Sequence, residues 1–183
     1  MDAAEVLATL GKSPTFAILD GARDSRVGNL ARGELARCLY RGTLPKDLGE
    51  AAPHLVRMWA ANEQTQRFFK MGWHQSWGVL LSYSGPIKIL YRHLRQFLRA
   101  RTEGGQTLLF RYYDPRVLRA YLPTCTAEEL ERFFGPVEAV AVEDEAPDAF
   151  YVFRRALRGF EQRHVSPKDK WRLVRTWDHV PEA

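Results

Sequence analysis

The sequence predicts an α/β fold, in which a mixed β-sheet is flanked by helices and a short basic appendage follows at the C-terminus. Compact apolar runs at residues 15–20 and 77–83 are typical of buried strands. The apolar positions of residues 86–101 recur three or four apart, as in an amphipathic helix. Such strands and helices alternate through the middle of the chain, which favours a sheet with helices on its faces. Short connections near both ends allow antiparallel pairs within the sheet.

The length and charge of the chain limit its organisation. It has 183 residues, of which 45% are hydrophobic, and its formal net charge is +5. We expect an N-terminal helix in residues 1–14, an α/β domain in residues 15–155 and a basic, aromatic tail in residues 156–183. No apolar run reaches the roughly 18 residues that a membrane span needs, and the acidic start is unlike a secretory signal. We therefore expect a cytoplasmic protein.

After the N-terminal helix, the first half of the chain is expected to form four strands and one further helix. The strands are short apolar runs bounded by turn residues, at residues 15–20, 39–41, 55–59 and 77–83. The helix spans residues 62–71 and ends at Gly72.

The second half opens with a long helix over residues 86–101, whose outward face is basic. Residues 107–113 are apolar on both faces of the pleat except for Arg111, as in a strand that is covered on both sides. Asp114 is then expected to cap a short helix, with Pro115 in its first position.

A second capped helix and two closing strands follow. Thr126 and Glu129 have the spacing of a capping box, and this helix should end at Gly135. The closing strands are expected at residues 137–142 and 149–154, on either side of an acidic loop.

The tail begins at Ala156, where arginine and lysine surround a few large apolar residues. Ser166 could open a last helix, in which Trp171, Val174 and Trp177 would form an apolar stripe.

Candidate partner-binding residues lie on the basic face of the 86–101 helix and in the tail, because arginines and large aromatic residues often anchor interfaces. They are Arg92, Arg95, Arg99, Arg163, Trp171, Arg172, Arg175 and Trp177. The ordinary alternative is that the helix charges form a solvated face and that Trp171 docks on the sheet.

Four short motifs give the chain a family resemblance. They are FAILDGARD at residues 16–24, WGVLL at 77–81, FRYYDPRVL at 110–118, and FGP at 134–136 followed by VAVED at 140–144. In order and spacing they resemble the effector adaptors, or chaperones, of the type VI secretion system, whose core domain is catalogued as the domain of unknown function DUF4123. The resemblance covers about residues 15–145. It implies a cytoplasmic protein that binds a cognate toxic effector and assists its loading onto the VgrG spike.

Two other functions remain open from the residues themselves. Asp20, Asp24 and Asp114 could hold a divalent ion for phosphoryl transfer, although turn and capping chemistry explains them as well. The arginine-rich helix could bind nucleic acid, but the positive charge of the chain is spread from Arg23 to Arg175 instead of being gathered into a lysine-rich tail, which weakens that interpretation. His74 could act as a general base, but no serine or cysteine lies in a recognised nucleophile motif. Cys38 and Cys125 are isolated thiols without the spacing of a metal site. We therefore assign no catalytic, cofactor-binding or metal-binding residue and do not expect an enzyme.

Overall fold

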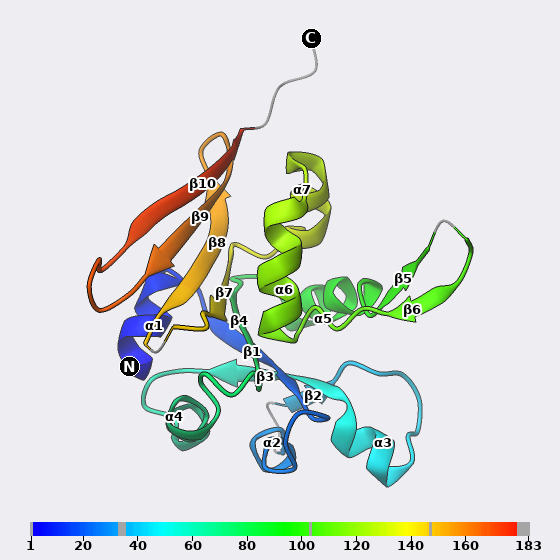
Figure 1. The fold of residues 1–183 in the computed structure, drawn as a ribbon. Coiled ribbons are helices and arrows are strands. Elements are labelled where there is room, and N and C mark those ends of the chain that lie inside the picture. Colours follow the sequence, from blue (N-terminus) through cyan, green and yellow to red (C-terminus); the bar gives the residue numbers. More distant parts are fainter. Residues whose placement is uncertain (1, 33–35, 103, 147, 179–183) are drawn as a thin grey trace.

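The protein is built on one large antiparallel sheet with helices on both faces (Figure 1). The computed structural model describes residues 2–32, 36–102, 104–146 and 148–178. The sheet has the strand order β10-β9-β8-β7-β4-β1-β3-β2, and all its pairs are antiparallel. Its strands are β1 (Thr15–Asp20), β2 (Ala36–Cys38), β3 (Pro53–Met58), β4 (Gly78–Ser82), β7 (Ala139–Glu143), β8 (Phe150–Ala156), β9 (Gly159–Val165) and β10 (Arg172–Asp178). The predicted α/β class is confirmed, but the described strands of the sheet pair only antiparallel, whereas a mixed sheet was predicted.

The remaining elements cover the sheet or project from it. The helices are α1 (Ala3–Thr9), α2 (Val27–Leu30), α3 (Lys46–Ala51), α4 (Glu63–Met71), α5 (Ile87–Gln96), α6 (Pro115–Tyr121) and α7 (Ala127–Phe134), with a short 3-10 turn at Leu122–Thr124. A separate hairpin of β5 (Arg99–Arg101) and β6 (Thr107–Leu109) extends away from the body (Figure 1). None of the described helices has both the length and the apolar character that crossing a membrane requires.

Two hydrophobic cores lie on opposite faces of the central strand β1, because successive side chains of a strand point to opposite faces. Phe16 and Ile18 pack in the core that includes α5, α6 and α7. Ala17 and Leu19 pack in the core that includes α1, α2 and α4. The strand predicted at residues 15–20 therefore has the predicted bounds and is buried along its whole length.

The caps predicted at Asp114 and Thr126 are confirmed, and Asn62, which was predicted as part of a helix, caps a third one. The Asn62 side chain accepts a hydrogen bond from the Thr65 amide at the start of α4, and Asp114 accepts one from the Arg116 amide at the start of α6. Thr126 and Glu129 form the reciprocal capping box of α7. These bonds satisfy amides that a helix leaves unpaired in its first turn.

The strand predicted at residues 107–113 is largely wrong. Only Thr107–Leu109 is a strand, it pairs with β5 instead of the main sheet, and its three residues are exposed. Residues 110–113 are irregular, yet Tyr112 and Tyr113 are buried. A short apolar run indicates burial, but it does not by itself distinguish a strand from another buried segment.

The helix predicted at residues 86–101 ends early, at Gln96. Arg99–Arg101 belongs to the hairpin, whose turn contains Gly105 with a φ of 81° that favours glycine. The strand predicted at residues 39–41 is also wrong, because the corresponding strand is Ala36–Cys38. The strands predicted around residues 55–59, 77–83, 137–142 and 149–154 are present with ends shifted by one or two residues.

The helix expected to open at Ser166 is wrong. Residues 159–165 and 172–178 form β9 and β10, which extend the main sheet. The register of this pair shifts between Leu173 and Arg175, so Val174 occupies a β-bulge. Residues 179–183, the end of the predicted tail, lie outside the described residues.

Candidate partner-binding surfaces

The signature segment at residues 110–118 joins several parts of the fold. The carboxylate of Asp20, at the end of β1, is fully buried and forms an ion pair with the guanidinium of Arg111. This hydrogen bond raises the pKa of Arg111, and Asp20 also accepts a hydrogen bond from the Ala22 amide at 3.2 Å. Arg111 therefore supplies the cationic partner that a buried carboxylate needs.

Two buried tyrosines of the same segment hold α5 and the loop after β2. The Tyr112 hydroxyl donates a 2.8 Å hydrogen bond to the Leu94 carbonyl near the end of α5. Tyr113 forms a side-chain hydrogen bond with Tyr40, and burial raises the pKa of Tyr113. Through these hydrogen bonds the signature segment holds α5 and the loop after β2 in place.

A groove of about 750 Å³ lies between the hairpin, the end of α5 and the segment that links β2 to α3. The Tyr91 hydroxyl of α5 donates a 2.7 Å hydrogen bond to the Cys38 carbonyl of β2 and so links two of the elements beside the groove. The residues that line the groove are Leu39, Tyr40, Arg41, Leu44, Leu48, Arg95, Gln96, Leu98, Arg99, Thr107, Leu108 and Leu109. We call it the hairpin groove.

The hairpin groove is apolar and basic. Leu48, Leu108 and Leu109 are among the exposed large hydrophobic residues, and the lining includes three arginines but no carboxylate. The Arg95 guanidinium lies over the Tyr91 ring at 5.1 Å, and its buried Nε has no hydrogen-bond partner among the described residues. Such a surface suits a partner with apolar side chains and carboxylates.

The three arginines predicted on one helix face are separated by the structure. Arg95 and Arg99 line the hairpin groove, although Arg99 belongs to β5 and not to the helix. Arg92 is exposed on α5 and does not line the groove. Sequence periodicity places all three on one helix and does not show the hairpin that brings Leu108 and Leu109 beside Arg99.

The five residues predicted in the tail lie on or beside β10. Arg172 is exposed, and Trp171 lies under the Arg163 guanidinium, which is 4.9 Å from the ring centroid. The Arg175 guanidinium lies over the Trp177 ring and donates to the Pro123 carbonyl at 2.5 Å. Trp177 itself is 6% exposed, and its indole N–H donates a 2.9 Å hydrogen bond to the Cys125 carbonyl. Its side chain belongs to the core and is not available to a partner.

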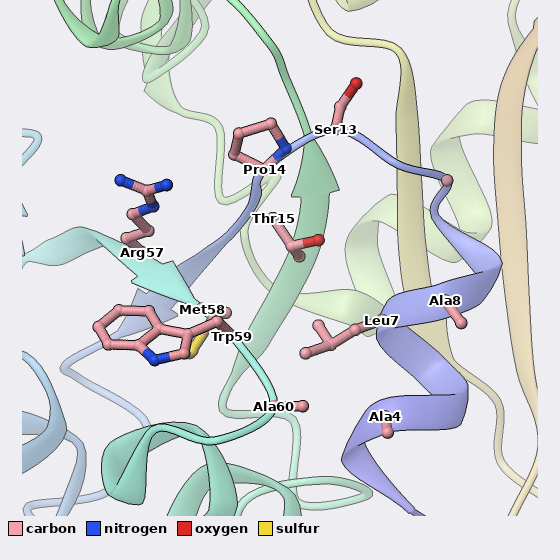
Figure 2. A pocket seen from close by; sticks show the side chains of 11 residues that line it. Ala4, Leu7, Ala8, Ser13, Pro14, Thr15, Arg57, Met58, Trp59 and Ala60 are labelled. Carbon is pink, nitrogen blue, oxygen red and sulfur yellow. The ribbon is translucent and has the colours of Figure 1, made fainter.

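A second apolar hollow of about 680 Å³ lies between α1 and the end of β3 (Figure 2). The small side chains of Ala4 and Ala8 leave it open on the helix side, and Leu7 and the exposed Trp59 face it. It includes none of the predicted binding residues.

A polar cleft of about 450 Å³ was not predicted from the sequence. At its base, the carboxylate of Glu143 is buried and accepts hydrogen bonds from the amides of His74 and Ser76 at 2.5 and 2.7 Å. Burial raises the pKa of Glu143. Both donors have positive φ values, 64° for His74 and 59° for Ser76, which is unusual for residues other than glycine. No local motif indicates this loop geometry.

The three carboxylates considered for a metal ion are each bound by an arginine. Asp20 pairs with Arg111, and the side chain of Asp24 binds Arg26, whose hydrogen bond lowers the pKa of Asp24 to about 2. Asp114 binds Arg116 at 2.6 Å in addition to capping α6. The contacts give each carboxylate a structural role.

Comparison with known proteins adds one finding. A family model described as a domain of unknown function, DUF4123, matches residues 15–132. The matched region contains β1, the signature segment and all of the hairpin groove. No curated protein and no solved structure matches the chain.

Proposed function

The chain belongs to the DUF4123 family, and from this premise we propose that it is a type VI secretion adaptor, which binds a cognate toxic effector and assists its loading onto the VgrG spike. The support for the secretion role is the resemblance of its motifs to those of such adaptors. The support for protein binding is the hairpin groove.

One observation carries the protein-binding role: exposed leucines and unopposed arginines line the same groove. A two-stranded hairpin has little stability of its own in water, and here it presents Leu108 and Leu109 to solvent. Apolar anchors bordered by charge are typical of interfaces between proteins. An acidic, amphipathic segment of the effector would bury the leucines and pair its carboxylates with Arg41, Arg95 and Arg99.

The signature segment would act indirectly in this binding. Tyr113 is hydrogen-bonded to Tyr40, which lines the groove, and Tyr112 is hydrogen-bonded to the Leu94 carbonyl of α5. These hydrogen bonds hold the groove in its shape before a partner binds. A preformed site loses less conformational entropy on binding.

A tagged pull-down from the bacterium that carries the chain tests this proposal. The wild-type protein should retain a toxin and VgrG, and the Arg99→Glu variant should lose the toxin. Arg92→Glu is the matched control, because it makes the same charge change at an exposed arginine outside the groove. Recovery of nucleic acid that dissociates at moderate salt, or of no specific protein, would contradict the adaptor role.

A further inference from the structure

The outer edge of β10 is an open strand edge. Among the described strands β10 pairs only with β9, and it forms one end of the eight-stranded sheet. Six of its seven residues are exposed, and only Trp177 is buried. An edge strand carries a row of N–H and C=O groups that can pair with another strand, and proteins usually cover or shorten such edges.

Large apolar side chains accompany this edge. Trp171 is 58% exposed, and Leu173 and Val174 are also exposed. Arg163 fixes one side of Trp171 through its cation–π contact. Isolated exposed apolar residues are ordinary, but three within four positions beside a strand edge offer a partner several apolar contacts.

The edge is held firmly enough to serve as a template. β10 pairs with β9 from Arg172 to Asp178, and the Trp177 indole is anchored to the Cys125 carbonyl. The bulge at Val174 interrupts the register within the strand, so an added strand would have to accommodate that irregularity.

Charge selects the kind of strand that fits. Lys170, Arg172 and Arg175 are exposed along the segment, with Asp169 before it and Asp178 at its end, so basic residues predominate. A second copy of the chain would bring the same basic residues, Lys170, Arg172 and Arg175, to this edge, and such like charges repel each other. An extended segment with carboxylates and apolar residues would instead pair with this edge favourably.

We propose that the outer edge of β10 binds an extended, acidic segment of a partner protein by strand addition. Main-chain hydrogen bonds to β10 would supply the affinity, and contacts with Trp171, Leu173 and Arg172 would supply the selectivity. This interaction does not rest on the hairpin groove and stands whichever protein contributes the strand.

The test uses the full chain and a synthetic eight-residue peptide of alternating valine and glutamate. Amide hydrogen exchange should slow in residues 170–178 when the peptide is added, and fluorescence polarisation of the labelled peptide gives its Kd. Replacing the glutamates by lysine, or the chain's Arg172 by glutamate, should weaken binding at least tenfold. Arg92→Glu is the matched control, because it makes the same charge change at an exposed arginine outside both β10 and the groove, and it should leave the peptide Kd unchanged.

Three further outcomes would overturn the proposal. Two further peptides would be N-methylated at alternate amides, so that one edge of each extended peptide, a different edge in each, loses its N–H donors. If both bound as tightly as the unmodified peptide, main-chain pairing with β10 would not be involved. If hydrogen exchange in residues 170–178 did not slow at millimolar peptide, the edge of β10 would not accept a strand. If exchange slowed with protein concentration alone, a second copy of the chain would cover that edge.

Discussion

Replacing Arg111 by methionine should lower the free energy of unfolding by about 3 kcal/mol. Asp20 is fully buried, and without Arg111 its carboxylate would retain the hydrogen bond from the Ala22 amide but lose its cationic partner. Removing one partner of a buried ion pair costs about 3–5 kcal/mol. We take the lower end because the Arg111 side chain is 38% exposed, so water can enter its place.

This loss is large enough to measure by two methods. For a chain of this size about 1 kcal/mol corresponds to roughly 2–4 °C, so the Tm should fall by roughly 6–12 °C. Urea unfolding should give the same difference at an unchanged m-value. Arg92→Met is the control, because Arg92 is exposed, and it should change stability by less than about 0.5 kcal/mol.

A double-mutant cycle separates the ion pair from other effects of the substitution. The Asp20→Asn change removes the charge that Arg111 neutralises, so combining it with Arg111→Met should cost clearly less than the sum of the two single changes. A loss below about 1 kcal/mol in Arg111→Met, or strict additivity in the cycle, would refute the view that this pair fastens the signature segment to β1.

Three further changes have defined outcomes. Asp114→Ala removes the cap of α6 and should cost about 1 kcal/mol in urea unfolding; no loss would mean that the cap bond is unimportant. Trp177→Phe leaves the Cys125 carbonyl without its donor and should cost about 1–2 kcal/mol while partner retention is unchanged; lost retention would show that Trp177 contacts the partner. Burial lowers the pKa of His54 and of His93 below about 6.5. The unfolded chain therefore binds more protons just below that pH, and stability should fall as the pH drops from about 7 toward 5. A flat urea midpoint over this range, or an undiminished slope in His93→Gln, would contradict that assignment.

The sequence predicts well those features that depend on neighbouring residues. Asp114 and Thr126 cap helices as predicted, because a polar side chain can reach an amide two or three positions ahead, whatever the rest of the chain does. The bounds of β1 follow from an uninterrupted apolar run that ends at Asp20.

The errors occur where contacts distant in sequence decide the structure. In the tail, the spacing of Trp171, Val174 and Trp177 favours a helix, but a bulge at Val174 interrupts the alternation of a strand. In the signature, burial of Tyr112 and Tyr113 comes from packing of an irregular segment and not from sheet pairing. Local patterns contain no information about either arrangement.

The candidate site could be predicted only in part for the same reason. The sequence places Arg95 and Arg99 among the candidate partner contacts, but the leucines that make the surface a groove come from a hairpin that periodicity does not indicate. Glu143 contacts the loop at His74 and Ser76 across nearly 70 positions of sequence, and no sequence motif indicates this contact.

The most direct test of the hairpin groove is the affinity of the co-purified effector for two matched variants. Leu108 in the groove is 51% exposed and Ile89 on α5, outside it, is 50% exposed, so Leu108→Asp and Ile89→Asp introduce the same charge at equally accessible apolar positions. We predict that Leu108→Asp weakens effector binding at least tenfold, while Ile89→Asp leaves the Kd within twofold of wild type. Equal affinities for both variants, or a loss confined to Ile89→Asp, would contradict it.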